Sequence, residues 1–252
     1  MIGVRKLGRM RTLEGAEQGE RAGLMQRYAI YWAPESGGPL ARFGAEWLGW
    51  DAETGAPCAH RPVADLPAPI ADITATPRRY GFHATLKPPF ALADGTGPDA
   101  LLDAVRTLAA DIAAFEAPRL VLSRGHGFAS LRLSLPSPAM SALAGRAVSA
   151  LDGFRAPLCA ADLARRRAST LSPEAEANLT RWGYPWVMAL FDFHLTLSGA
   201  LAPDALEAAC AALDPLVAPF CAAPLMVREI CVFADPGGGA PFRLLDRVPL
   251  AR

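Results

Sequence analysis

Two short stretches decide how this sequence folds: RYGFHATLK at residues 79–87 and FDFHLTLS at residues 191–198. Both contain the pattern His-x-Thr-Leu. Successive side chains of a β-strand point to opposite faces, so each stretch has an apolar face and a polar face that carries the histidine and the threonine. The sequence therefore predicts two strands that pack their apolar faces against helices and leave their polar faces free.

The surroundings of the two strands are also similar. A Pro-Asp-Ala-Leu helix start follows each strand, at residues 98–101 and 203–206, and apolar residues then recur at helical spacing. Two strand-like runs joined through glycines come next in both halves, which gives internal repeats at about 80–135 and 186–250. This order predicts an α+β protein of two lobes. It would have two antiparallel sheets related by an approximate two-fold axis, helices on the outer faces and a central cleft between the polar faces.

The chain is expected to hold one domain at residues 27–252, preceded by an extension at residues 1–26. The extension is polar and lacks steady periodicity, which fits either disorder or a true start at Met25. The strand-like run YAIYW at residues 28–32 opens the domain. The other expected elements are a helix over residues 40–50, a long irregular connection over 51–77, a helix over 139–154 and a helix that starts at Ser172-Pro173-Glu174.

The composition narrows the class of protein. Of the 252 residues, 52% are hydrophobic and 20% are charged, which suits a globular core. No apolar run reaches the roughly 18 residues that a membrane span needs, and the N-terminus lacks the apolar stretch of a secretory signal. The five cysteines form no Cys-x-x-Cys pair, as is typical of free thiols in a reducing compartment. We therefore expect a cytoplasmic protein without a membrane partner.

Two of the four histidines, His83 and His194, occupy matched positions in the two strands. An unperturbed imidazole has a pKa of about 6.5, so one ring can accept a proton from an attacking water or hydroxyl while the other donates a proton to a departing oxygen. Thr85 and Thr196, two residues further along the same faces, can donate hydrogen bonds to the non-bridging oxygens of a phosphate. The pattern predicts a phosphodiester site with His83 and His194 as acid and base, in an order that the sequence leaves open.

Three further cations are candidate substrate ligands. Lys87 and Arg79 share the parity of His83 and could place positive charge near the phosphate, although a solvated lysine at a strand end is an equal alternative for Lys87. Arg166 belongs to the run Arg165-Arg166-Arg167, which either folds over the cleft or forms a solvated helix face. The histidines show no spacing typical of a metal site, so neither a metal nor another cofactor is expected.

The paired His-x-Thr motifs resemble those of the two-histidine (2H) phosphoesterase superfamily, which includes bacterial RNA 2′,3′-cyclic phosphodiesterases with 2′-5′ ligase activity. Three segments are similar to a branch of that superfamily encoded in bacterial phosphonate-utilisation operons: RYAIY at residues 27–31, YGFHATLKPP at 80–89 and RWGYP at 181–185. The resemblance implies a bilobal fold, metal-independent catalysis by His83 and His194, and small cyclic or linear phosphodiester substrates.

Three functions are open at this point. The first is hydrolysis of a small cyclic phosphodiester linked to phosphonate metabolism. The second is RNA end processing by a 2′,3′-cyclic phosphodiesterase or 2′-5′ ligase-like enzyme, and the third is a non-catalytic module that binds a phosphate ligand. The 25 basic and 25 acidic residues balance, and no basic surface interleaved with aromatic residues is evident, which favours a small phosphate ester over nucleic acid as the partner. The sequence gives no indication of the oligomeric state.

Overall fold

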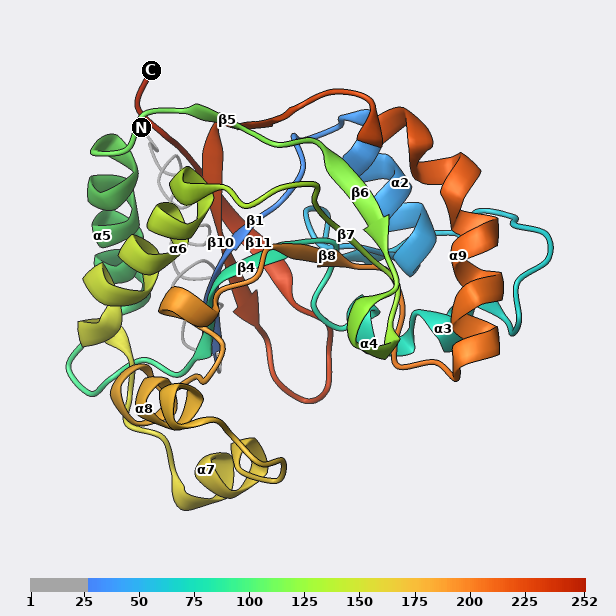
Figure 1. Cartoon of the computed structure of the whole chain (residues 1–252). Helices are drawn as coiled ribbons and strands as arrows, with labels where there is room; N and C mark the ends of the chain where they lie inside the picture. Colours follow the sequence, from blue (N-terminus) through green and yellow to red (C-terminus); the bar gives the residue numbers. More distant parts are fainter. Residues whose placement is uncertain (1–26) are drawn as a thin grey trace, which may run out of the picture.

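Two antiparallel sheets form the frame of the computed structural model, which describes residues 27–252 (Figure 1). The predicted extension at residues 1–26 lies outside the described residues. The larger sheet has the strand order β11-β10-β1-β4, and the smaller one has the order β6-β7-β8. The bounds are Arg27–Trp32 for β1, Ala84–Phe90 for β4, Leu120–Ser123 for β6, Ser130–Leu133 for β7, His194–Thr196 for β8, Glu229–Asp235 for β10 and Arg243–Pro249 for β11. The predicted α+β fold with two antiparallel sheets is confirmed.

Each sheet combines strands from both halves of the chain. The first motif strand, β4, joins a sheet whose hairpin β10–β11 comes from the C-terminal half, and the second motif strand, β8, joins the hairpin β6–β7 from the N-terminal half. Both motif strands stand at the edge of their sheets and lie against each other. A short antiparallel pair, β5 (Phe115–Ala117) with β9 (Leu225–Val227), also links the halves. The exchange of hairpins therefore brings two motifs together that are far apart in the sequence.

Helices cover the outer faces of the two sheets. Figure 1 shows α5 and α6 on one side of the molecule and α2 and α9 on the other. The first pair packs on β10, β11 and β4, and α9 packs on β6. A pair of shorter helices, α7 and α8, lies together at one end (Figure 1). The bounds are Pro39–Leu48 for α2, Pro98–Ala110 for α5, Pro138–Ala150 for α6, Ala160–Arg166 for α7, Pro173–Trp182 for α8 and Pro203–Val217 for α9.

The motif strands bury the side chains that their alternation predicts. Ala84 and Leu86 of the first stretch are buried, as are Phe193, Leu195 and Leu197 of the second. These side chains belong to the core cluster that also contains the inward faces of α5, α6 and α9. Burial of apolar surface stabilises the folded state by about 25 cal/mol per Å² of area removed from water. This free energy determines which side of each strand faces the helices and which faces the cleft.

Proline and serine mark the helix starts. Proline is the first residue of α2, α5, α6, α8 and α9. It suits this position because it has no backbone N–H to leave unpaired in the first turn. Ser172 caps α8 by accepting a hydrogen bond from the backbone N–H of Ala175 at 3.2 Å, so the helix start predicted there is confirmed. The helix ends at Gly183, whose φ of 73° is the left-handed conformation that favours glycine.

Several elements differ in extent from the sequence expectation, including the second motif strand, which is limited to His194–Thr196. The connection over residues 51–77 is not irregular throughout, because it contains a hairpin and two single-turn helices packed near α2: β2 (Trp50–Asp51), β3 (Ala56–Pro57), α3 (Ile70–Ile73) and α4 (Ala75–Arg78). The first motif strand begins at Ala84 rather than Arg79, since Gly81 turns the chain with a φ of 76°. The helix expected over 139–154 ends at Ala150 and is followed by a 3-10 turn, Asp152–Phe154.

None of the helices formed by residues 27–252 combines the length and the apolar character that crossing a membrane requires.

Candidate active site

The backbone holds the two motif histidines in the same way. Nδ1 of His83 lies 2.9 Å from the carbonyl oxygen of Gly81, and Nδ1 of His194 lies 2.9 Å from the carbonyl oxygen of Asp192. A carbonyl oxygen only accepts, so Nδ1 carries the proton in the neutral form of each ring. In each case the backbone carbonyl of the residue two positions earlier determines the tautomer of the histidine. The lone pair of each neutral ring is therefore on Nε2, the atom available for proton transfer.

His83 is half-buried among aromatic rings. Its ring stacks on Tyr31 with centroids 3.6 Å apart and contacts Phe233 at 6.2 Å. Burial lowers the pKa of His83 from its usual 6.5 to about 4; the Gly81 carbonyl opposes this shift, and the positive charge of His194 adds to it. His83 is therefore neutral at neutral pH. The hydroxyl of Thr85, 3.0 Å away, donates to its Nε2.

His194 sits at the start of β8 with its ring 5.8 Å from that of Phe128. Burial is the main cause that lowers its pKa, and the nearby Arg132 guanidinium lowers it further. The Asp192 carbonyl and carboxylate act in the opposite direction. Because a negative charge stabilises imidazolium, a phosphate anion bound between the rings would raise the pKa of both histidines.

A cavity of about 640 Å³ opens between Thr85 of β4 and Thr196 of β8. His83 lies on its wall, whereas His194 is outside the wall and precedes Thr196 on the same strand. The remaining lining is rich in arginine and tyrosine, and the side chains involved are Arg27, Arg79, Arg165, Arg166, Tyr31, Tyr80 and Tyr184. The two polar strand faces thus meet at one cavity that contains hydroxyl donors, an imidazole and positive charge.

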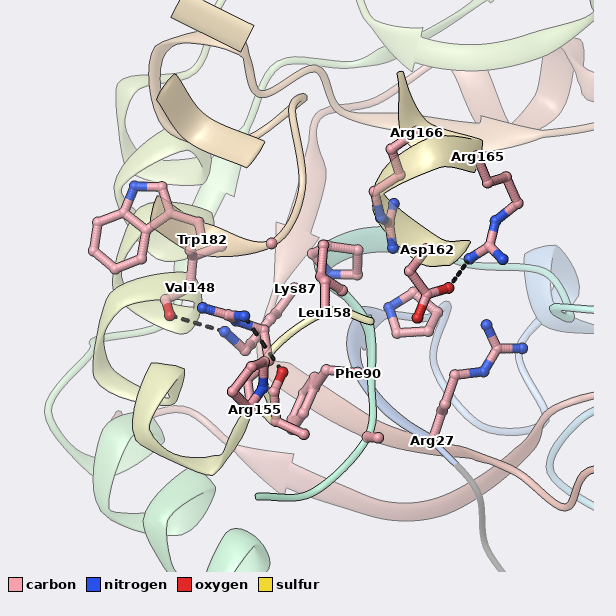
Figure 2. Close-up of a pocket in the computed structure, with 16 residues that line it drawn as sticks. Arg27, Lys87, Phe90, Val148, Arg155, Leu158, Asp162, Arg165, Arg166 and Trp182 are labelled. Atoms are coloured by element: carbon pink, nitrogen blue, oxygen red, sulfur yellow. Dashed lines mark hydrogen bonds and ion pairs between the residues drawn. The ribbon is translucent and has the colours of Figure 1, made fainter. Parts of the chain in front are cut away.

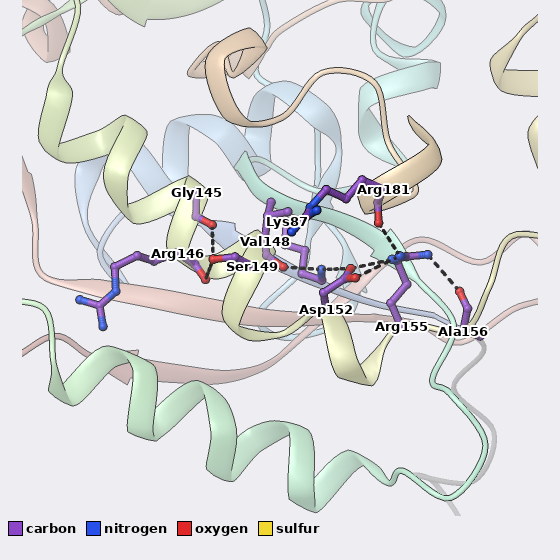
Figure 3. Close-up of polar contacts among 9 residues, drawn as sticks. All are labelled: Lys87, Gly145, Arg146, Val148, Ser149, Asp152, Arg155, Ala156 and Arg181. Carbon is purple, nitrogen blue, oxygen red and sulfur yellow. Dashed lines mark hydrogen bonds and ion pairs between the residues drawn. The ribbon is translucent and has the colours of Figure 1, made fainter. Parts of the chain in front are cut away.

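Lys87 does not share this cavity, and the expectation that it lies on the same face as His83 is wrong. Its ammonium group is buried on the helix side of the sheet, where Nζ donates to the carbonyl oxygen of Val148 at 3.0 Å and lies 3.5 Å from Oδ1 of Asp152 (Figure 3). Arg155 donates to both oxygens of Asp152 and to the carbonyl of Arg181 at the end of α8. Lys87 therefore stabilises the C-terminal turn of α6 rather than facing the cleft.

A β-bulge is the reason for the misplaced lysine. Ile30 of β1 pairs with Lys87, but the next residue, Tyr31, pairs with Thr85, so Leu86 is an extra residue on β4. One extra residue breaks the alternation of faces, and Leu86 and Lys87 both become buried. The prolines at 88 and 89, which cannot donate ladder hydrogen bonds, were the sequence signal that this strand is irregular.

The structure brings the two predicted arginines to the cavity. Arg79 lies 3.9 Å from the buried carboxylate of Asp235, and the Arg166 guanidinium lies over the ring of Tyr184 at 4.7 Å from its centroid. Sequence reasoning missed Arg27, which starts β1 and forms an ion pair with Asp235 at 2.5 Å. Arg27 and Tyr184 both lie in segments that carry the family resemblance, and that signal could have identified them.

The lowered pKa of His83 predicts an acid-sensitive fold. Above pH 6.5 both the folded and the unfolded chain hold this imidazole neutral; from pH 6.5 to about 4 only the unfolded chain takes up the proton. The free energy of unfolding should therefore fall by about 3 kcal/mol over this interval because of His83 alone. His83→Asn removes this contribution, so urea titrations of the two proteins at several pH values should show a difference that changes steeply between pH 6.5 and 4. A pH-independent difference would contradict the shifted pKa.

The protein has an α+β fold with two antiparallel sheets, and His83, Thr85 and Thr196 line one cavity. Residues 85–243 match the family model described as "Protein of unknown function (DUF1045)". This match covers more than half of the chain, and the protein belongs to the DUF1045 family. The matched region includes Thr85, His194 and Thr196 and begins two residues after His83.

Two curated relatives carry the name ribose 1,5-bisphosphate phosphokinase PhnN. The protein from Janthinobacterium sp. (strain Marseille) is 34% identical over 232 residues, which are 90% of this chain and 51% of the relative. The protein from Laribacter hongkongensis (strain HLHK9) is 38% identical over 227 residues, which are 86% of this chain and 50% of the relative. The chain thus spans about half the length of the curated relatives it matches.

Among solved structures the fold aligns with one described as a phosphoesterase, at 16% identity and a TM-score of 0.39, covering 90% of this chain and 99% of that one. It also aligns with E. coli LigT bound to phosphate, at 14% identity and a TM-score of 0.37, with the same coverage of both chains. At these scores the likeness assigns neither an activity nor a ligand to this chain.

Proposed function

We propose that this protein is a phosphoesterase that hydrolyses a small cyclic phosphodiester, with His83 and His194 as general base and general acid. The observation that carries the proposal is the matched pair of Nδ1–carbonyl hydrogen bonds, which places the lone pair of each neutral ring on Nε2; in His83 this atom accepts from the hydroxyl of Thr85, which a substrate would displace. Thr85 and Thr196 flank the same cavity, where the hydroxyl of Thr196, and that of Thr85 once it turns from Nε2 of His83, can donate to the non-bridging oxygens of the phosphate. The sequence resemblance to two-histidine phosphoesterases supports the same reaction class.

The environments of the rings favour one order of proton transfers. His83, neutral because of its pKa of about 4, takes a proton from water through Nε2 as the water oxygen attacks phosphorus. Burial lowers the pKa of His194, but the carboxylate of Asp192 acts in the opposite direction, and a bound substrate anion would raise this pKa and favour a proton on Nε2. As the bond between phosphorus and the leaving oxygen breaks, His194 donates that proton. The product is a ring-opened phosphate monoester.

The names of the curated relatives support a link to phosphonate metabolism and to ribose phosphates. The kinase name describes the whole relatives, and the region that matches this chain is only about half of each relative's length. The only lysines here are Lys6 and Lys87, and neither follows a glycine, so the chain contains no Gly-Lys-Ser/Thr phosphate-binding sequence. We therefore propose the phosphoesterase reaction, rather than a kinase reaction, for this chain, with cyclic phosphates of ribose as the first substrates to test.

A substrate panel tests the proposal. Ribose cyclic phosphates, nucleoside 2′,3′-cyclic phosphates and short RNAs with 2′,3′-cyclic ends would be incubated with the protein in the presence of EDTA, and phosphorus NMR would detect ring opening. We expect turnover of a small cyclic phosphate that EDTA does not reduce. Preferential turnover of RNA ends would instead support the RNA-processing alternative, and phosphate binding without any turnover would support a non-catalytic module. Loss of turnover in EDTA would contradict the metal-independent mechanism.

A further inference from the structure

The cavity wall carries more positive charge than one phosphodiester requires. Among the described residues, the guanidinium groups of Arg27, Arg79, Arg165 and Arg166 face it. Asp235, which is buried, offsets the first two by pairing with Arg27 at 2.5 Å and lying 3.9 Å from Arg79. Asp162 pairs with Arg165. These carboxylates leave an excess of positive charge at the wall, and a diester carries only one negative charge.

Arg166 is the arginine of this wall that forms no direct ion pair within the described residues, although the charge of Asp162 acts on it. Its guanidinium is held over the ring of Tyr184, and its Nε is buried with no hydrogen-bond partner within residues 27–252. Burial lowers the pKa of Arg166, and the neighbouring charges of Arg165 and Arg27 act in the same direction. Arg166 as a whole is only half-buried, but a buried Nε–H without a partner is costly unless an anion accepts from it, because the hydration of that group is lost without replacement. Stacking on Tyr184 fixes the planar group in advance for such an anion.

The arginines occupy a different part of the cavity from the threonine hydroxyls. Figure 2 shows Arg165 and Arg166 reaching from α7, and Arg27 from the start of β1, toward the same opening. This opening continues into a recess of about 80 Å³ beside Pro88 and Pro89, which also line the larger cavity. At about 640 Å³ the larger cavity has the size of sites that bury a whole small metabolite, not a phosphate alone. A substrate anchored at Thr85 and Thr196 can therefore extend to the arginines.

We propose that Arg166, with Arg165 and Arg27, binds a second phosphate group, a monoester dianion, on the same small molecule whose cyclic phosphodiester meets His83 and His194. This inference rests on the proposed function for the position of the diester. Guanidinium groups suit a terminal phosphate because they donate parallel, charge-assisted hydrogen bonds to its oxygens. The substrate class is thus a sugar or nucleoside that carries a cyclic phosphate at one end and a phosphate monoester at the other.

Matched substrates test this subsite. Adenosine 2′,3′-cyclic phosphate and its 5′-phosphorylated form, together with a ribose cyclic phosphate with and without a 5-phosphate, differ only in the second phosphate. In the wild-type protein we expect kcat/KM to be at least about 10-fold higher for the phosphorylated member of a pair. In Arg166→Gln we expect this preference to be reduced by about 10- to 100-fold, the effect of losing a charge-assisted hydrogen bond. Arg167→Gln is the matched control, since Arg167 pairs with Glu176 outside the cavity and should leave the preference intact.

Equal kcat/KM values within the pairs, or a preference that survives in Arg166→Gln, would overturn the inference. If no cyclic phosphate is turned over at all, the proposed function fails, and calorimetry still tests the subsite with ribose 5-phosphate, which has a monoester and no diester. Binding that Arg166→Gln weakens about 10-fold or more, and that Arg167→Gln does not, would support the subsite in that case. Absent binding, or equal binding by both variants, would refute it.

Discussion

Replacing either motif histidine by asparagine is expected to lower kcat on a cyclic phosphodiester by about 10²- to 10⁴-fold, the contribution of a positioned acid or base. Asparagine can keep the hydrogen bond to the backbone carbonyl of Gly81 or Asp192, because its amide nitrogen lies near the position of Nδ1. It has no group at the position of Nε2. The substitution therefore removes the proton-transfer atom while it preserves the donor that orients the side chain.

Steady-state kinetics of His83→Asn, His194→Asn and the double variant, on proteins whose circular dichroism matches the wild type, would measure this effect. Since the two rings act on one transition state, the double variant should lose little more than the worse single variant. The control is His126→Asn in the turn between β6 and β7, where His126 has a φ of 63° that asparagine also tolerates. Turnover that persists in both single variants would refute the acid–base assignment.

Truncation of Lys87 is expected to destabilise the fold strongly although the residue lies outside the larger cavity. Lys87→Ala removes a buried ammonium from the carbonyl oxygen of Val148 and from Asp152, and it leaves a gap beside Phe90, whose ring lies 5.2 Å from Nζ. Breaking a buried pair from one side leaves polar groups without partners. We expect the free energy of unfolding to fall by about 3 kcal/mol, with Asp152 still held by Arg155.

Lys87→Met provides the matched comparison, because methionine keeps most of the side-chain volume and removes only the charge. Replacement of a buried ion pair by an apolar group of similar volume is often close to neutral, so we expect a loss of about 1 kcal/mol or less. Urea denaturation would measure both variants. Lys87 lines the small recess beside Pro88 but not the larger cavity, and its ammonium group is turned to the carbonyl of Val148, so KM for a cyclic phosphate should not change in Lys87→Met. A KM raised 10-fold or more at unchanged stability would show that Lys87 binds substrate after all.

Much of the fold could be predicted from residue patterns that act locally. The alternation in the two His-x-Thr strands identified the buried apolar residues correctly, from Ala84 and Leu86 to Leu195 and Leu197, because a one-residue change of register would expose every apolar side chain; it did not predict that Lys87 is buried. The helix starts at Pro98 and Pro203 were equally clear, since proline fits the first turn of a helix. His83, Thr85 and Thr196 followed from the same alternation and lie at one cavity.

Pairing between strands that are far apart in the sequence determined two features that the local patterns do not predict: the position of Lys87 and the contact between Arg27 and Asp235. Period-two alternation assumes an unbroken ladder, and the β-bulge that turns Lys87 away from the cleft exists only because β4 pairs with β1. Arg27 and Asp235, which are 208 positions apart, meet because β1 pairs with β10.

The sequence by itself therefore determined which apolar side chains of the two motif strands are buried and which histidines and threonines share a polar face, because those preferences arise between neighbouring residues. Only the tertiary structure decided which charges surround the cavity, because guanidinium and carboxylate groups from separate elements come within contact distance only after the sheets have assembled.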